Sequence, residues 1–148
     1  KGKPSSSTTQ FSWLGDGKYY TLSTTTDTSD ELLLTRLGAN DPDFNIRRDA
    51  AFMLRRNDSG NTTFASVIEP HGSYSPVSEL SVNSDSSIAE LSIVHDDDAY
   101  TAVSIESVKG VKSLFILANK DAAKSKQHKL KVKGKEFSWT GPYLYTGS

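Results

Sequence analysis

The most distinctive local string in the sequence is Glu69-Pro70-His71-Gly72-Ser73-Tyr74, which places a carboxylate, an imidazole and a phenol within six residues. We expect it at the end of a strand, where functional loops often lie. A histidine and a tyrosine there could perform β-elimination, one removing the proton next to a carboxylate and the other protonating the leaving oxygen. The competing interpretation is a turn made by Pro70 and Gly72, whose polar side chains satisfy the backbone.

All five arginines lie between Arg36 and Arg56, and four of them form the neighbouring pairs Arg47–Arg48 and Arg55–Arg56. Successive side chains of a strand face opposite sides, so each pair places one guanidinium group on each face. Guanidinium groups bind anions such as uronic acids, sulfate and phosphate in a bidentate manner. The alternative is that they form ion pairs with nearby acidic residues of this chain.

Near the C-terminus, Lys129, Lys131 and Lys133 alternate with apolar residues, which places three ammonium groups on one face of an expected strand. Such a face is usually solvated or protects a sheet edge, but it also suits a polyanionic sugar. Tyr143 is an aromatic side chain free to stack on a sugar ring. The candidate ligand-binding residues are therefore Arg47, Arg48, Arg55, Arg56, His71, Tyr74, Lys129, Lys131 and Tyr143.

The string His95-Asp96-Asp97-Asp98 offers oxygen ligands beside an imidazole, so a Ca²⁺ or Zn²⁺ ion near His95, Asp96 and Asp98 is conceivable. Its spacing matches neither a calcium-binding helix-loop-helix nor a zinc-binding helix, and a short acidic turn explains it more simply. We expect no cofactor. A catalytic serine motif and a phosphate-binding glycine loop are also absent from the sequence.

The composition favours strands and turns, because 22 serines and 13 threonines stand in a chain of 148 residues. The chain has no cysteine, which excludes disulfides and thiolate metal sites. Its net charge of −1 gives little support for nucleic-acid binding, and no apolar run is long enough to span a membrane. The charge is nevertheless segregated: residues 77–106 carry seven acidic residues and no lysine or arginine, and residues 109–135 carry nine lysines. Such segregation can bring oppositely charged strands together across a sheet, or build a basic face for an anionic ligand.

Short runs of alternating apolar residues recur between turn signals, and they predict an antiparallel all-β sandwich of about ten short strands with little or no helix. The polar residues 1–10 are expected to form a linker or a frayed end, and residues 11–148 a single domain. A helix is the competing prediction for residues 44–56. The predicted strands lie in 11–14, 18–24, 31–37, 44–56, 62–69, 88–95, 100–108, 113–119, 128–133 and 136–139.

Three strings carry a resemblance to a known family: residues 38–45 with Arg47, residues 51–55, and residues 63–72, of which FASVIEPHG is the most specific. They resemble the C-terminal β-domain of heparinase II/III-like polysaccharide lyases, in particular the alginate (oligoalginate) lyase branch. The resemblance covers roughly residues 11–145. It implies an N-terminal (α/α) toroid followed by antiparallel sheets, and β-elimination at uronic acids.

The sequence given contains no such toroid, and the family's catalytic motifs match no positions in it, so it reads as a piece of a longer protein. We therefore expect a non-catalytic accessory domain that binds an anionic polysaccharide such as alginate, next to the catalytic toroid of a secreted or periplasmic lyase. The alternative is a purely structural domain that supports the toroid or an oligomer and has no ligand of its own.

Overall fold

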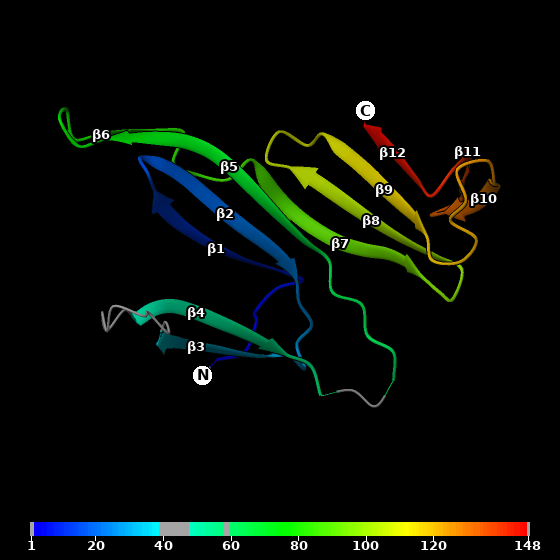
Figure 1. The fold of residues 1–148 in the computed structure, drawn as a ribbon, viewed down its shortest axis with the longest axis horizontal. Helices are drawn as coiled ribbons and strands as arrows, with labels where there is room; N and C mark the ends of the chain where they lie inside the picture. Colours follow the sequence, from blue (N-terminus) through cyan, green and yellow to red (C-terminus); the bar gives the residue numbers. More distant parts are fainter. Residues whose placement is uncertain (1, 39–47, 58–59, 148) are drawn as a thin grey trace. The chain divides into compact units, whose positions relative to one another are not determined.

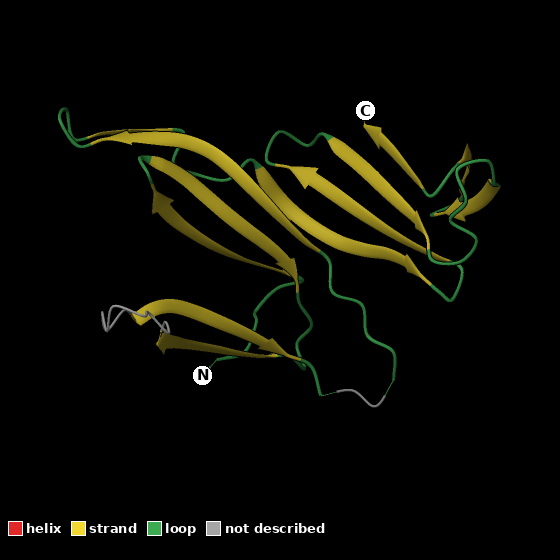
Figure 2. Cartoon of the chain, viewed as in Figure 1, coloured by secondary structure: helices red, strands yellow, loops and turns green. Residues whose placement is uncertain are grey.

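The computed structural model describes residues 2–38, 48–57 and 60–147, and in this part of the chain every regular element is a strand (Figures 1 and 2). The prediction of an all-β, antiparallel fold without helix is confirmed. The described residues accordingly include no helix that could cross a membrane. The strands are β1 (Thr8–Gly15), β2 (Lys18–Thr25), β3 (Glu31–Gly38), β4 (Arg48–Arg55), β5 (Ser66–Ser75), β6 (Leu80–Val82), β7 (Ile88–Asp96), β8 (Tyr100–Ser107), β9 (Lys112–Ala118), β10 (Gln127–Val132), β11 (Lys135–Thr140) and β12 (Tyr143–Gly147).

The chain divides into two compact units. The hairpin unit comprises Lys1–Ser7 and Thr26–Thr62 and contains the antiparallel pair β3–β4. The two-sheet unit comprises Thr8–Thr25 and Thr63–Ser148. The predicted linker 1–10 and single domain 11–148 stay a prediction. Within residues 1–10, strand β1 already begins at Thr8, and Gly2 forms a β-bridge to Leu32 in the hairpin unit.

The two-sheet unit contains the four-stranded sheets β1-β2-β5-β6 and β12-β9-β8-β7 and the hairpin β10–β11. Strand β1 is joined to β7 of the other sheet by side-chain hydrogen bonds. Thr8 Oγ1 accepts from the Leu91 amide (2.9 Å) and donates to the Leu91 carbonyl (3.0 Å), and Gln10 Nε2 donates to the Ile88 carbonyl (2.9 Å). These bonds hold the two sheets together through strands that are far apart in sequence.

The apolar core lies between the second sheet and the hairpin β10–β11. Ala102 of β8 and Ile116 of β9 are fully buried, and they pack with Val132 and Trp139 of the hairpin. Trp139 also donates its indole Nε1–H to the Gly141 carbonyl (3.1 Å), so its polar atom is satisfied inside the core. The core therefore fixes the hairpin against one face of the sheet.

The first sheet buries a polar face instead of an apolar one. Thr21 and Ser23 of β2 are completely buried, and Thr21 forms side-chain hydrogen bonds with Ser12 and His71. On the opposite face, the rings of Trp13 and Tyr20 stack 5.5 Å apart, and Trp13 remains 45% exposed. The apolar residues that alternate along these strands therefore lie on the more exposed face of this sheet.

Two hairpins close with two-residue turns in which both central residues have positive φ. These turns are Asp16-Gly17 (φ 48° and 71°) between β1 and β2, and Lys133-Gly134 (φ 47° and 87°) between β10 and β11. This geometry is that of a type I′ turn, which favours asparagine, aspartate or glycine at its first central position. Asp16 conforms to that preference, and Lys133 does not.

Candidate functional site

His71 lies inside strand β5, and both of its ring nitrogens are hydrogen-bonded. Nδ1 lies 2.9 Å from the Asn83 carbonyl oxygen, so it carries the hydrogen and donates. Nε2 lies 2.8 Å from Thr21 Oγ1, and the ring stacks on Tyr19 with 6.2 Å between centroids. The imidazole therefore links β2, β5 and the segment after β6, which matches the interpretation that this string satisfies the backbone.

Gly72 is the residue at which strand β5 bulges, which explains the glycine in the string around His71. His71 pairs with Tyr19 and Ser73 with Lys18, so Gly72 is the additional residue of a β-bulge. Its φ is +55°, and a Cβ there would overlap the backbone carbonyls of Val82 and Asn83. The predicted loop is thus a strand with a bulge, and Tyr74 continues it as a half-buried residue whose amide donates to the Gly17 carbonyl (2.9 Å).

Glu69, which opens the string, is also bound within the fold. Burial of this carboxylate acts to raise its pKa, but hydrogen bonds from Ser86 and Ser87 outweigh that effect and hold the pKa of Glu69 below its ordinary value. The Ser87 amide lies 3.1 Å from Oε2. The ionised carboxylate therefore holds the segment that follows β6 against the polar face of the first sheet.

Of the two arginine pairs, the structure describes the side chains of Arg55 and Arg56 only. Arg56 forms two hydrogen bonds to the fully buried Asp30, from Nε to Oδ1 (2.6 Å) and from Nη2 to Oδ2 (2.7 Å). This guanidinium group lowers the pKa of Asp30. Arg55 is 53% exposed and lies 3.7 Å from Glu31. Arg47 lies outside the described residues, and of Arg48 only the backbone, which pairs with Gly38, is described.

The acidic string after β7 forms a turn. Asp97 Oδ1 accepts hydrogen bonds from the amides of Tyr100 (2.7 Å) and Ala99 (2.8 Å), which lower its pKa, and Oδ2 lies 2.9 Å from His95 Nε2. Asp96 accepts from Thr101, and Asp98 pairs with Lys120. Within the described residues, no three histidines or acidic residues converge in a way that could hold a metal ion.

The lysine-rich segment forms the hairpin β10–β11, with Lys129 and Lys131 exposed as the alternation predicts. Lys129 Nζ lies 3.0 Å from Glu136 Oε2, and Lys131 is the cross-strand partner of Glu136. Glu136 therefore pairs with Lys129 and stands opposite Lys131 in the register of the hairpin. Lys133 and Lys135 follow at the turn, and no carboxylate of the described residues lies within ion-pair distance of either one.

Beside this hairpin, two adjoining hollows of about 200 and 190 Å³ open between it and the second sheet. We call them together the lysine groove. They share Lys135 and Phe137 of β11, and Lys135 Nζ lies 5.3 Å from the centre of the Phe137 ring. The first hollow is lined by Ser104, Lys112, Ser113, Leu114, Lys135, Phe137 and Thr146, and the second by Val94, Ser104, Leu114, Val132, Lys133, Lys135 and Phe137.

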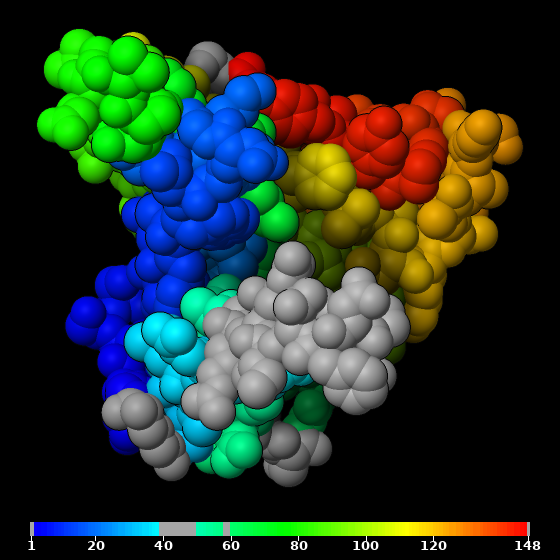
Figure 3. Space-filling model, turned by 60° about the vertical axis from the view of Figure 1, so that its left-hand side comes forward, coloured from blue at the N-terminus to red at the C-terminus, as the bar shows by residue number. Residues whose placement is uncertain are grey.

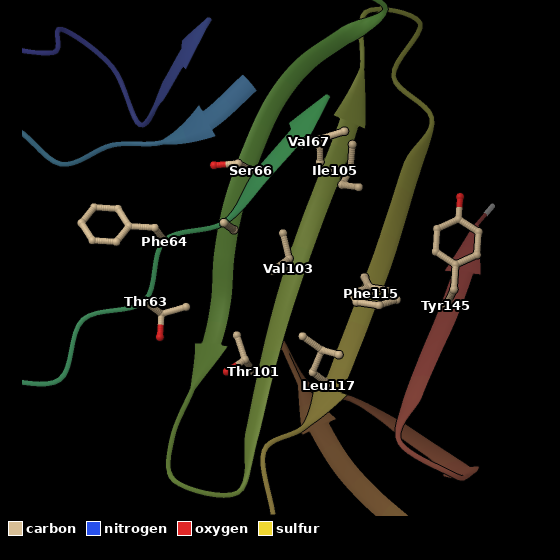
Figure 4. Close-up of a pocket in the computed structure, with 11 residues that line it drawn as sticks. Thr63, Phe64, Ser66, Val67, Thr101, Val103, Ile105, Phe115, Leu117 and Tyr145 are labelled. Atoms are coloured by element: carbon tan, nitrogen blue, oxygen red, sulfur yellow. The ribbon is translucent and has the colours of Figure 1, made fainter. Parts of the chain in front are cut away.

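A larger groove of about 440 Å³, which we call the apolar groove, lies on the other face of the second sheet (Figure 4). Val103 and Ile105 of β8, Phe115 and Leu117 of β9, and Tyr145 of β12 line it, together with residues 63–67. The space-filling view shows β12, which carries Tyr145, beside β9, which carries Phe115 (Figure 3). Tyr143, a predicted ligand residue, is exposed on β12, and its ring lies 5.7 Å from that of Phe115.

The structure therefore separates the predicted site residues into different places. Arg55 and Arg56 belong to the hairpin unit, His71 and Tyr74 to the first sheet, Lys129 and Lys131 to the hairpin β10–β11, and Tyr143 to the second sheet. The lysine groove adds residues that the pattern did not single out: Lys112, Lys135 and Phe137. The nine lysines of residues 109–135 were the available signal, but their convergence with β9 depends on tertiary structure.

Comparison with known proteins shows similarity to alginate lyases, while no family model matches the chain. An alginate lyase from Stenotrophomonas maltophilia (strain K279a) is 33% identical over 143 residues, which are 97% of this chain and 19% of that protein. An exo-oligoalginate lyase from Saccharophagus degradans is 26% identical over 132 residues, 87% of this chain and 18% of that protein. The predicted similarity to alginate lyases is confirmed, whereas the heparinase II/III-like assignment stays a prediction. The chain spans about a fifth of the length of these relatives.

Proposed function

We propose that this chain is a non-catalytic domain of a polysaccharide lyase that acts on alginate, and that the domain binds the anionic uronate polymer. The names of the two similar proteins support the substrate class. The observation that carries the binding role is the lysine groove, in which Lys133 and Lys135 have no acidic partner among the described residues. Under this proposal the parent lyase is secreted or periplasmic, and its catalytic toroid is the domain's covalent partner.

The groove has the chemistry that a polyuronate requires. Such a polymer presents a carboxylate on every ring, and ammonium groups attract it by Coulomb interactions at the surface. Ser104 and Thr146 also line the groove, and their hydroxyl groups can exchange hydrogen bonds with sugar hydroxyls. The half-buried Phe137 ring supplies an apolar surface for the ring carbons. Charge, hydroxyl groups and an aromatic ring thus occur together.

The non-catalytic part of the proposal is supported by the state of the histidines. Both ring nitrogens of His71 are already hydrogen-bonded. A tyrosine–histidine pair does exist between Tyr100 and His128, whose OH and Nδ1 lie 3.3 Å apart, but His128 is only 5% exposed and stacks on Trp139. Because so little of His128 is exposed, we expect the chain alone to release no unsaturated uronate.

The first test is the mobility of the 148-residue chain in native gels that contain alginate. We expect alginate to retard it and a neutral glucan to leave its mobility unchanged, because the groove attracts negative charge. Retardation should weaken as salt is raised from about 20 to about 300 mM, since the screening length shrinks to below about 6 Å over that range. Equal mobility with and without alginate at low salt would rule out the binding role.

A purely structural role is the second candidate, and the apolar groove favours it. Leu117 and Tyr145 line the groove and remain exposed, and contiguous exposed apolar surface commonly marks a protein contact. In this case the domain supports the rest of the parent lyase, or an oligomer of it, through the second sheet.

The structural candidate predicts that the isolated chain binds a fluorescent apolar dye while its near-ultraviolet circular dichroism stays that of a packed protein. Replacement of Leu117 by glutamine should lower the dye signal, because it places a polar group in the groove lining. The exposed Val77, in the turn between β5 and β6, offers a control: Val77→Gln should leave the signal unchanged. Equal dye signals from the wild type and Leu117→Gln would count against the groove as the exposed contact.

A further inference from the structure

The geometry points to a two-subsite arrangement in the lysine groove, in which two consecutive uronate rings of an acidic oligosaccharide lie in the two hollows. This inference rests on the proposed function and specifies where and how the polymer binds. Lys112 lines only the first hollow, Lys133 lines only the second, and Lys135 lines both. Each hollow is therefore lined by two lysines, one of them shared, which suits a polymer with a carboxylate on each ring.

The two hollows are similar in volume, at about 200 and 190 Å³. Lys135 and Phe137 lie at their boundary, because both residues line both hollows. The Phe137 ring packs against the buried core cluster, so its position is fixed before any ligand arrives. A fixed ring between two hollows can contact the apolar faces of two neighbouring sugars at little entropic cost.

The hydroxyl groups of the groove are unevenly divided, which gives the two subsites different characters. Ser104 lines both hollows, Thr146 lines the first only, and Val94 and Val132 line the second only. The first subsite is thus suited to hydrogen bonds with sugar hydroxyls, and the second to apolar contact plus the charge of Lys133. Lys112 reaches the first subsite while it is paired with Glu106 at 3.0 Å, so a uronate there competes with that carboxylate.

Lys133 supplies an independent observation in favour of a ligand. It occupies the first central position of a type I′ turn with a φ of 47°, where an L-residue other than asparagine, aspartate or glycine is disfavoured. The equivalent turn between β1 and β2 uses Asp16. Protection of a sheet edge explains lysines within strands, such as Lys129 and Lys131, but not a lysine in a turn. An ammonium group held there at a conformational cost is consistent with a functional contact.

The test compares Lys133→Asn and Lys135→Gln with the matched control Lys124→Gln, which removes an exposed charge outside the groove. The ligands are an alginate tetrasaccharide and the same oligosaccharide with its carboxylates reduced to alcohols, and binding is measured by calorimetry. We expect each groove variant to weaken tetrasaccharide binding about two- to fivefold, and the double variant about four- to twenty-fivefold, as for exposed ion pairs that act independently. The control should bind like the wild type, and the reduced oligosaccharide should bind to none of the proteins.

The melting temperature separates the roles of Lys133. Because asparagine suits the type I′ turn, Lys133→Asn should raise the melting temperature by about 1–4 °C while the affinity for the tetrasaccharide falls.

The length of the oligosaccharide tests the number of subsites. A disaccharide should already reach the affinity of longer oligomers once the number of binding registers is taken into account.

The outcomes distinguish this inference from the proposed function on which it rests. If the wild-type chain binds neither alginate polymer nor tetrasaccharide, the proposed function itself fails. If the wild type binds but the double variant binds equally well, the polymer lies elsewhere and the subsite assignment is wrong. An affinity that keeps rising beyond the disaccharide would overturn the two-ring assignment, and a lower melting temperature of Lys133→Asn would overturn the argument from the turn.

Discussion

Replacement of Arg56 by methionine is expected to cost the hairpin unit about 3–5 kcal/mol of unfolding free energy, as breaking a buried ion pair does in other proteins. The Asp30 carboxylate is fully buried and accepts two short hydrogen bonds from Arg56. Methionine keeps much of the side-chain length but leaves that carboxylate without its cation. Denaturant unfolding followed by hydrogen exchange of β3 and β4 measures the loss.

The neighbouring Arg55 provides the matched control, because it is half-exposed and 3.7 Å from its partner Glu31. We expect Arg55→Met to cost about 1 kcal/mol or less, as exposed ion pairs do. Equal losses from the two variants would contradict the assignment of Arg56 as the buried member of the pair. The difference between Arg55 and Arg56 also bears on anion binding. Arg56 is already bound to Asp30, so Arg55 has the more exposed guanidinium group for an anion.

The same ion pair predicts how stability depends on pH. The hydrogen bond from Arg56 lowers the pKa of Asp30 from its ordinary value of 3.8, so folding favours the ionised form. The resulting stabilisation is complete above the unfolded-state pKa and is lost as the pH falls through the lower folded-state pKa. The stability difference between wild type and Arg56→Met should therefore shrink below about pH 4. A difference that stays constant down to pH 2 would contradict this account.

Replacement of Gly72 by alanine is the second change with a large expected effect, a loss of about 2–5 kcal/mol. A side chain at a φ of +55° is strained, by about 1–2 kcal/mol. In addition, the new Cβ would overlap the carbonyls of Val82 and Asn83, and such overpacking costs about 1–3 kcal/mol more. The backbone of β6 would have to move away from β5, and the bond from His71 to Asn83 would break. Thermal and denaturant unfolding measure the effect.

Gly134→Ala is the control for the steric part of this effect. Gly134 also has a positive φ, of +87°, but a Cβ there would meet nothing within 4 Å. We expect this variant to show the conformational strain alone, about 1–2 kcal/mol. If Gly72→Ala and Gly134→Ala were equally costly, the close approach of the β6 segment to Gly72 would be contradicted.

The strands were predictable from the sequence because most of them alternate apolar and polar residues between clear turn signals. The signals failed at Pro70–Gly72, where a proline and a glycine predicted a loop. Strand β5 continues through both, because the bulge at Gly72 absorbs the extra residue. For residues 44–56 the strand prediction over a helix is confirmed for Arg48–Arg55, and residues 44–47 lie outside the described part.

The burial of the first sheet could not be predicted in the same way. Alternation identifies two faces but assumes that the apolar face is the buried one. Here Thr21 and Ser23 are completely buried, while Ile68 on the opposite face is 63% exposed. Hydrogen bonds among Ser12, Thr21 and His71 compensate for burying the polar groups. These bonds connect β1, β2 and β5, and a sequence does not reveal which hydroxyl groups will meet.

The candidate site was predictable in chemistry but not in location. The segregation of acidic and basic segments indicated contacts between strands of opposite charge, and Glu106 does pair with Lys112 across β8 and β9. The same segregation indicated a basic face, but the lysines of one hairpin did not reveal the groove. That groove forms only because core packing places Phe137 beside the strands β8 and β9.

The most direct test of the central claim, binding of an anionic polysaccharide at the lysine groove, is an NMR titration of the 148-residue chain with alginate disaccharide. The account predicts that amide signals of Ser113, Lys133, Lys135 and Thr146 shift with one common affinity, and that those of Gly72 and His71 on the first sheet stay in place. Shifts confined to the first sheet, or no shifts at millimolar disaccharide, would contradict it.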